Sequence, residues 1–239
     1  MTTIASNLQS VRERIAAACA AAGRDVNEVT LLPVSKTFGP DAVREAFSAG
    51  EMAFGENYIQ EAVEKQALLA DLAIAWHCIG PIQSNKTRLV AEHFDWAHTV
   101  DRLKIAQRLS EQRPAARAPL DVCIQVNIDG GPAKSGVAPG DALALAREVA
   151  ALPRLRLRGL MTIPEPDEHF DAQLAVHRKA RALFDELRAA GLPLDTLSMG
   201  MTADLEAAVH AGSTMVRVGT AVFGTRPRKL TSSPQPPAA

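Results

Sequence analysis

A chain of 239 residues with 47% hydrophobic content is long enough to bury one large core. Its 26 Lys and Arg residues balance 27 Asp and Glu residues, so the net charge of -1 gives no basic surface for nucleic acid and favours small ligands. The sequence has no secretion signal, no membrane-length apolar run and no CxxC pair, which predicts a cytoplasmic protein with reduced thiols that binds neither nucleic acid nor membranes.

The first predicted element is an amphipathic helix over residues 4–22, in which apolar residues recur at spacings of three and four until Gly23. Eight short apolar runs then predict strands at residues 29–35, 52–55, 75–80, 95–100, 120–128, 155–163, 196–199 and 214–218. Helical patterns lie between them, for example at residues 41–49, 56–71, 102–112, 139–151, 170–190 and 203–211. This alternation predicts an α/β fold, the (β/α)8 TIM barrel.

The domain organisation is expected to be simple. No internal repeat or low-complexity linker divides the chain, so we expect one domain over residues 1–228. After the eighth predicted strand, the remaining Pro- and Ser-rich segment is too short for a full eighth helix. We expect a short element there, a disordered tail over residues 229–239, and an N-terminal helix that covers the resulting gap.

Lys36 departs from the pattern around it. The run from Val29 to Val34 is apolar enough for a strand buried on both faces, yet Ser35 and Lys36 follow it directly. In a TIM barrel the C-terminal ends of the strands carry the chemistry, which makes Lys36 a candidate functional amine. A solvated loop lysine is the alternative.

The seventh and eighth predicted strands end in segments suited to an anion. Gly200 and Thr202 precede a helix whose first N–H groups lack intrahelical partners, and Gly219 and Thr220 end the eighth strand. Loops at these two positions commonly bind phosphate in TIM barrels. Each feature, taken alone, is equally typical of an ordinary helix cap or strand end.

Arg217 interrupts the apolar stretch TMVRVG just before the second of these loops. A buried arginine requires an acceptor, and a structural ion pair with a carboxylate is one alternative. Because strands one and eight are neighbours in a closed barrel, Lys36, Arg217 and the phosphate loops would face a single ligand. Asp204 and Glu206 would repel a phosphate there unless their side chains project sideways.

The chain resembles the pyridoxal phosphate (PLP) homeostasis proteins, the YggS/PROSC family, whose fold is the barrel domain also found in alanine racemase. The matching stretches run from about residue 29 to residue 224: LLPVSKT, FGENYIQEA, WHCIGPIQSNK, TVDR, KSG, LRLRGLMTI, SMGMTADLEAA and GSTMVRVGTAVFG. The resemblance implies that Lys36 forms the internal aldimine with PLP and that Arg217 faces the pyridine nitrogen. It also implies a position near the cofactor for Asn57, and phosphate contacts for Ser198, Thr202, Gly219 and Thr220.

Two places depart from the family pattern. Thr202 stands where a serine is expected, which keeps the hydroxyl but adds a methyl group. Before the KSG stretch, Gly130, Gly131 and Pro132 replace acidic or polar residues, so the role of this loop and of Lys134 stays open.

The resemblance implies a monomeric PLP-binding protein that holds the cofactor on Lys36 and acts in PLP (vitamin B6) homeostasis or delivery, with apo PLP-dependent enzymes as candidate recipients. Aldimine formation needs a neutral amine, which burial and the charge of Arg217 would favour. Arg217 would keep the ring nitrogen unprotonated, and Lys36 could serve one face of the ring only, so we expect little or no catalysis and no catalytic residue.

Two alternative functions remain from the sequence. The first is a weak PLP-dependent amino acid racemase or decarboxylase. The second is a cofactor-free Schiff-base aldolase, which is disfavoured because Arg217 would then lack an aromatic partner. We expect no metal site, because the spacing of His77 and His98 does not call for one.

Overall fold

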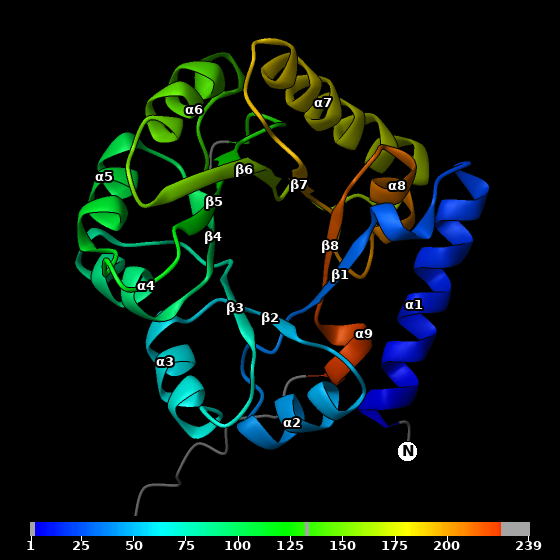
Figure 1. The fold of residues 1–239 in the computed structure, drawn as a ribbon. Helices are drawn as coiled ribbons and strands as arrows, with labels where there is room; N and C mark the ends of the chain where they lie inside the picture. The colour runs from blue at the N-terminus through cyan, green and yellow to red at the C-terminus, as the bar shows by residue number, and fades with distance from the viewer. Residues whose placement is uncertain (1–2, 132–133, 226–239) are drawn as a thin grey trace, which may run out of the picture.

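The computed structural model describes residues 3–131 and 134–225, so the tail expected at residues 229–239 lies outside the described residues. Eight parallel strands curve around a central axis, and helices surround them (Figure 1). The strands are β1 (Thr30–Pro33), β2 (Ala53–Glu56), β3 (Ala75–Cys78), β4 (Trp96–Val100), β5 (Leu120–Val126), β6 (Leu155–Thr162), β7 (Thr196–Ser198) and β8 (Met215–Val218). Each bound lies within two residues of the sequence prediction, and the predicted TIM barrel is confirmed.

The helices in the described residues alternate with these strands. They are α1 (Ile4–Ala21), α2 (Pro40–Ser48), α3 (Ile59–Leu68), α4 (Thr87–His93), α5 (Leu103–Gln112), α6 (Ala142–Ala150), α7 (Phe170–Ala189), α8 (Leu205–His210) and α9 (Thr220–Phe223), with short 3-10 turns at Val26–Glu28, Ser84–Lys86 and Pro139–Asp141. The predicted helix at residues 56–71 begins later, because Glu56 ends β2 and a loop follows it. None of the described helices combines the length and the apolar character that a membrane span requires.

The barrel closes between β1 and β2. The strand order runs from β1 through β8 and β7 down to β2, with Leu32 opposite Arg217 in the ladder between β1 and β8. Between β1 and β2 there is one isolated bridge, Val34 with Gly55, and the Ser35 N–H donates to the Gly55 carbonyl over 3.0 Å. The closing contact therefore lies at the C-terminal ends of the two strands, directly before Lys36.

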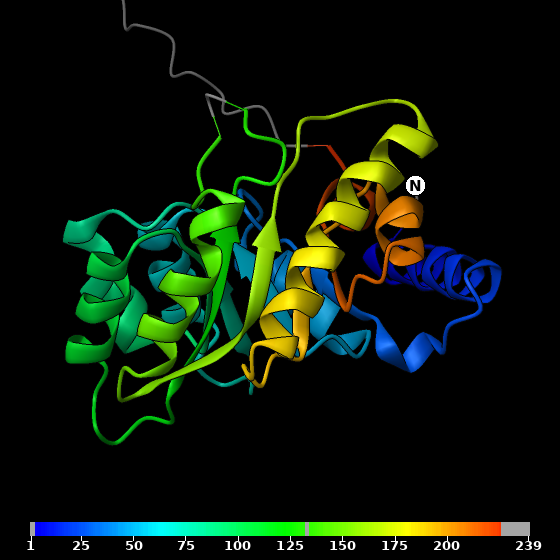
Figure 2. The ribbon, with the colours of Figure 1, turned by 90° about the horizontal axis from the view of Figure 1, so that it is seen from above.

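Helix α1 completes the outer ring. The four-residue helix α9 is too short to cover β8, and α1 packs against α2, α8 and α9 at this side of the barrel (Figure 1). Its buried face consists of Leu8, Val11, Ile15, Ala18 and Cys19. The side view in Figure 2 shows the parallel strands running towards one end of the barrel, from which the loop after β6 extends.

Candidate functional site

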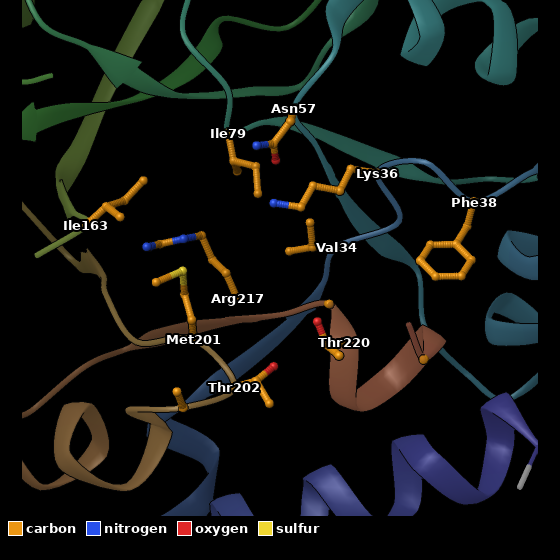
Figure 3. A pocket seen from close by; sticks show the side chains of 13 residues that line it. Val34, Lys36, Phe38, Asn57, Ile79, Ile163, Met201, Thr202, Arg217 and Thr220 are labelled. Atoms are coloured by element: carbon orange, nitrogen blue, oxygen red, sulfur yellow. The ribbon is translucent and has the colours of Figure 1, made fainter. Parts of the chain in front are cut away.

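A cavity of about 290 Å³ opens at the C-terminal ends of the strands. Its lining comes from β8, from the start of α9 and from the loops after β1, β2, β3, β6, β7 and β8 (Figure 3). The lining residues are Val34, Lys36, Phe38, Asn57, Ile79, Ile163, Met201, Thr202, Ala203, Arg217, Gly219, Thr220 and Gly224. Two of these side chains are cationic and none of the described lining residues carries a carboxylate, so the cavity suits an anionic ligand.

A network of hydrogen bonds fixes the backbone beside Lys36. The Ser35 hydroxyl donates to Glu56 Oε1 over 2.6 Å, and Lys65 Nζ donates to the Ser35 carbonyl over 2.9 Å and to the same carboxylate over 2.5 Å. All three side chains are buried. On the other side of Lys36, Thr37 has φ 68°, a left-handed conformation that costs free energy in a non-Gly residue. The buried network holds Lys36 in place against this strain.

Asn57 reaches the cavity from the loop after β2, next to Lys36 (Figure 3). Its Oδ1 is buried and has no hydrogen-bond partner within the described chain, which leaves an acceptor available to a ligand. Gly80, after β3, allows this arrangement, because a Cβ at that position would lie 2.0 Å from the Asn57 carbonyl oxygen.

Arg217 lies on β8 with 3% of its surface exposed, and its side chain reaches the cavity from below (Figure 3). One terminal nitrogen donates to the Ser198 hydroxyl over 2.8 Å and the other donates to the Thr162 carbonyl over 2.9 Å. The structural ion pair that the sequence left open is not found among the described residues. Burial lowers the pKa of Arg217 to about 10, so the guanidinium stays protonated at neutral pH.

Two buried histidines extend this network through the barrel interior. Ser198 Oγ lies 3.0 Å from His98 Nδ1, and His98 Nε2 lies 2.9 Å from His77 Nδ1. Burial lowers the pKa of His77 to about 3 and also lowers that of His98, so both rings are neutral. The Ser198 hydroxyl is thus engaged with Arg217 and His98, and Ser198 is not among the lining residues of the cavity.

The loops after β7 and β8 form the opposite wall. Thr202, in the loop after β7, and Thr220, the first residue of α9, face the cavity (Figure 3). Gly219, which precedes Thr220, also lines it. The two carboxylates that could repel an anion point elsewhere. Asp204 accepts a hydrogen bond from His177 over 2.9 Å, and Glu206 pairs with Arg14 over 2.8 Å.

Lys134 lies outside this arrangement. Its Nζ is 3.6 Å from a carboxylate oxygen of Glu165 and 3.4 Å from the Pro164 carbonyl oxygen, and it does not line the cavity. Gly130 and Gly131 belong to the described loop before it, whereas Pro132 lies outside the described residues.

A larger cavity, of about 640 Å³, includes residues at the N-terminal ends of the strands, among them Thr30, Ala53 and Trp96. It is lined by Arg24, Arg158 and Arg181, but each of these arginines is paired with a carboxylate. The smaller cavity is therefore the better candidate.

Within residues 3–131 and 134–225, no three His, Cys, Asp or Glu side chains gather as a metal site would require.

Comparison with known proteins decides the family. The model of the alanine racemase N-terminal domain family matches residues 6–227. A pyridoxal phosphate homeostasis protein of Pseudomonas aeruginosa is 61% identical over 226 residues, covering 95% of this chain and 97% of that protein. The chain belongs to the pyridoxal phosphate homeostasis protein family. Another member, from Escherichia coli K12, is 53% identical over 229 residues, covering 95% of this chain and 98% of its own.

A solved structure supports the same family assignment. PipY of Synechococcus elongatus, described as having PLP bound, is 38% identical, with a TM-score of 0.81, and the match covers 93% of this chain and 100% of that one. The family resemblance expected from the sequence is thereby confirmed.

Proposed function

We propose that this member of the family binds PLP in the cavity at the C-terminal ends of the strands, holds it covalently on Lys36, and delivers it to apo PLP-dependent enzymes. We further propose that it acts in the cytoplasm as a monomer. The observation that carries the proposal is that the amine of Lys36, just after β1, and the buried guanidinium of Arg217, on the neighbouring strand β8, line the same cavity. None of the described residues in that lining carries a carboxylate. The names of the relatives, and the PLP-bound description of PipY, support the choice of ligand.

The chemistry of the lining matches the groups of PLP. The cofactor supplies an aldehyde, an aromatic ring with a nitrogen acceptor, and a phosphate. Lys36 Nζ would form a C=N bond to the aldehyde carbon, with the aldehyde oxygen leaving as water. The unpartnered Oδ1 of Asn57 offers an acceptor on the same side of the cavity. The size of the cavity, about 290 Å³, fits a ligand of one ring.

Arg217 would donate a hydrogen bond to the ring nitrogen. Because its guanidinium stays protonated, it would keep that nitrogen an acceptor without a proton, which weakens the electron-accepting character of the ring. We assign Ser198 to this end of the site, because its hydroxyl accepts from Arg217. Thr202, Gly219 and Thr220 would hold the phosphate from the opposite wall.

The same lining supports binding of PLP without turnover. Among the described lining residues, Lys36 and Arg217 are the titratable groups, and Arg217 does not release its proton near neutral pH. Proton transfer at a bound amino acid would rest on Lys36 alone, whereas racemization needs groups on both faces. Tyr58, the one tyrosine of the chain, is 47% exposed and does not line the cavity.

The proposed function is tested with one PLP-loaded preparation in two assays. We expect it to restore activity to an apo PLP-dependent enzyme, and to convert alanine or serine no faster than free PLP does. Racemized, decarboxylated or transaminated product at about 1 per second or faster would favour the enzyme alternative. Failure to restore the apo enzyme would argue against delivery.

The phosphate contacts give a separate prediction. Thr202→Val and Thr220→Val should each weaken PLP retention by about 1–3 kcal/mol, since each removes one hydrogen-bond donor to a charged group. Equilibrium dialysis against PLP and against pyridoxal measures the effect, and pyridoxal should bind much more weakly than PLP to the wild-type protein. Equal affinity for the two ligands would mean that the loops after β7 and β8 do not hold the phosphate.

A further inference from the structure

The loop between β7 and α8, residues 199–204, is supported from behind by a buried pair of side chains. His177, on α7, has 1% of its surface exposed, and its Nε2 lies 2.9 Å from Asp204 Oδ2. The other carboxylate oxygen of Asp204 accepts a hydrogen bond from the Met201 N–H over 2.7 Å. One carboxylate therefore links helix α7 to the backbone of the loop that carries Met201, Thr202 and Ala203 into the cavity.

The loop is also fixed at Gly200. This residue has φ +95°, and a Cβ on it would lie 2.5 Å from Ala208 Cβ, so the loop already packs tightly on α8. The Gly200 carbonyl accepts from the Arg217 N–H over 3.0 Å. Gly200 is thus fixed by β8 and α8, and Asp204 holds the next residue of the loop through the Met201 N–H.

The direction of the hydrogen bond between Asp204 and His177 follows from the charge of the carboxylate. Burial raises the pKa of Asp204, but the hydrogen bonds from His177 and Met201 together lower it by more. The pKa of Asp204 therefore lies below its usual range, and the group is ionised. An ionised carboxylate only accepts, so His177 Nε2 carries the donated proton. His177 Nδ1 is buried without a partner in the described chain, which makes the histidine a poor choice for stability alone.

We propose that His177 is a positioning residue for the phosphate end of the cofactor, acting through Asp204 on the loop of residues 199–204. This inference rests on the proposed PLP site. The loop that Asp204 supports would contact the phosphate group of PLP. His177 and Asp204 do not line the cavity, and Lys36 and Asn57 lie at its other end, where the aldehyde of PLP would be bound. The loss of His177 should therefore reduce the preference of the site for PLP over pyridoxal.

A second support reaches the same loop from the surface and provides a control. Arg14, on α1, donates to the Thr202 carbonyl over 3.0 Å and pairs with Glu206. The Arg14 side chain is 36% exposed and the Glu206 side chain 41% exposed, and an exposed pair contributes little in water. Arg14→Gln should leave the PLP preference close to that of the wild type.

The test compares the ratio of the pyridoxal Kd to the PLP Kd in four proteins: the wild type, His177→Phe, His177→Gln and the control Arg14→Gln. We expect His177→Phe to lower this ratio about tenfold, the loss typical of one hydrogen bond to a charged group. His177→Gln, whose amide can donate from a similar position, should retain the wild-type ratio. Thermal unfolding and circular dichroism check that the variants fold, and if His177→Phe does not, His177→Asn, too short to reach Asp204, replaces it with the same expected loss.

The outcomes separate this inference from the proposed function. A wild-type protein that does not prefer PLP over pyridoxal overturns the proposed site itself. If the wild type prefers PLP and His177→Phe, or His177→Asn in its place, has the same preference, then His177 does not position the phosphate. The proposed PLP site would stand in that case. A loss in His177→Gln equal to that in His177→Phe shows that packing of the ring, rather than the donor, is responsible, and also overturns the inference.

Discussion

Lys36→Ala should abolish the covalent PLP complex. The amine of Lys36 enters the cavity from the end of β1, beside Asn57 and on the far side from the two threonines (Figure 3). Lys36 is the one lysine among the described residues that line this cavity, and we therefore expect its amine to form the bond to PLP. Absorbance of the protein after incubation with PLP and gel filtration measures the loss, which we expect to be complete for the aldimine band.

Two lysine variants serve as controls for this result. Lys134 is 22% exposed in its side chain and contacts Glu165, and Lys86 lies near Gln60, 3.5 Å from its side-chain oxygen. Both residues lie outside the cavity lining. Lys134→Ala and Lys86→Ala should keep the aldimine band. If the band disappears in either of these variants and is retained in Lys36→Ala, PLP is not bound to Lys36.

Lys65→Met should destabilise the fold strongly. It leaves the buried Glu56 carboxylate without its cation, and removing one partner of a buried ion pair costs about 3–5 kcal/mol of the free energy of unfolding. The double variant Glu56→Gln with Lys65→Met removes both charges and should recover part of the loss. Urea unfolding followed by circular dichroism measures all three proteins, and a loss below about 1 kcal/mol in Lys65→Met would contradict a buried pair.

The loss of unfolding free energy in Lys65→Met should also depend on pH. Burial raises the pKa of Glu56, although Lys65 and Ser35 act to lower it. For a carboxyl group with a raised folded-state pKa, the stabilising contribution is present below the unfolded pKa and is lost as the pH rises through the folded pKa. Without Lys65 the folded pKa of Glu56 rises further, so Lys65→Met should cost more near pH 7 than near pH 4.

The fold could be predicted well because its signals are local. Each buried parallel strand is a short apolar run, and eight such runs separated by helical patterns leave few alternatives to a barrel. Helix α4 was not among the predicted helices, because its seven residues, Thr87 to His93, are too few to show a clear helical period. Helix α3 starts later than predicted because Glu56 is the last residue of β2 and Asn57 lies in the loop that follows it.

The grouping of the candidate residues in one cavity could be predicted where it depends on strand ends. Lys36, Asn57, Thr202, Gly219 and Thr220 all follow strands, and parallel strands bring their C-terminal ends to one face. This places them in one cavity whatever the details of packing. Arg217 joins them because its own strand neighbours β1.

The supporting residues could not be read from the sequence. Lys65 has the pattern of a solvated helix lysine, and His177 lies on α7, separated from Asp204 by a strand and two loops. Their roles arise from contacts between elements, which no spacing along the chain records. Ser198 shows the same limit, because its hydroxyl lies beneath Arg217 rather than in the cavity lining.

Borohydride reduction of the PLP-loaded wild-type protein, followed by peptide mass spectrometry, identifies the residue that holds PLP. Reduction fixes the C=N bond as a stable secondary amine on the residue that formed it. We expect a single phosphopyridoxyl group, on the peptide that contains Lys36. Modification of Lys134 or Lys86 in its place, or no modified peptide from a protein that has bound PLP, would contradict it.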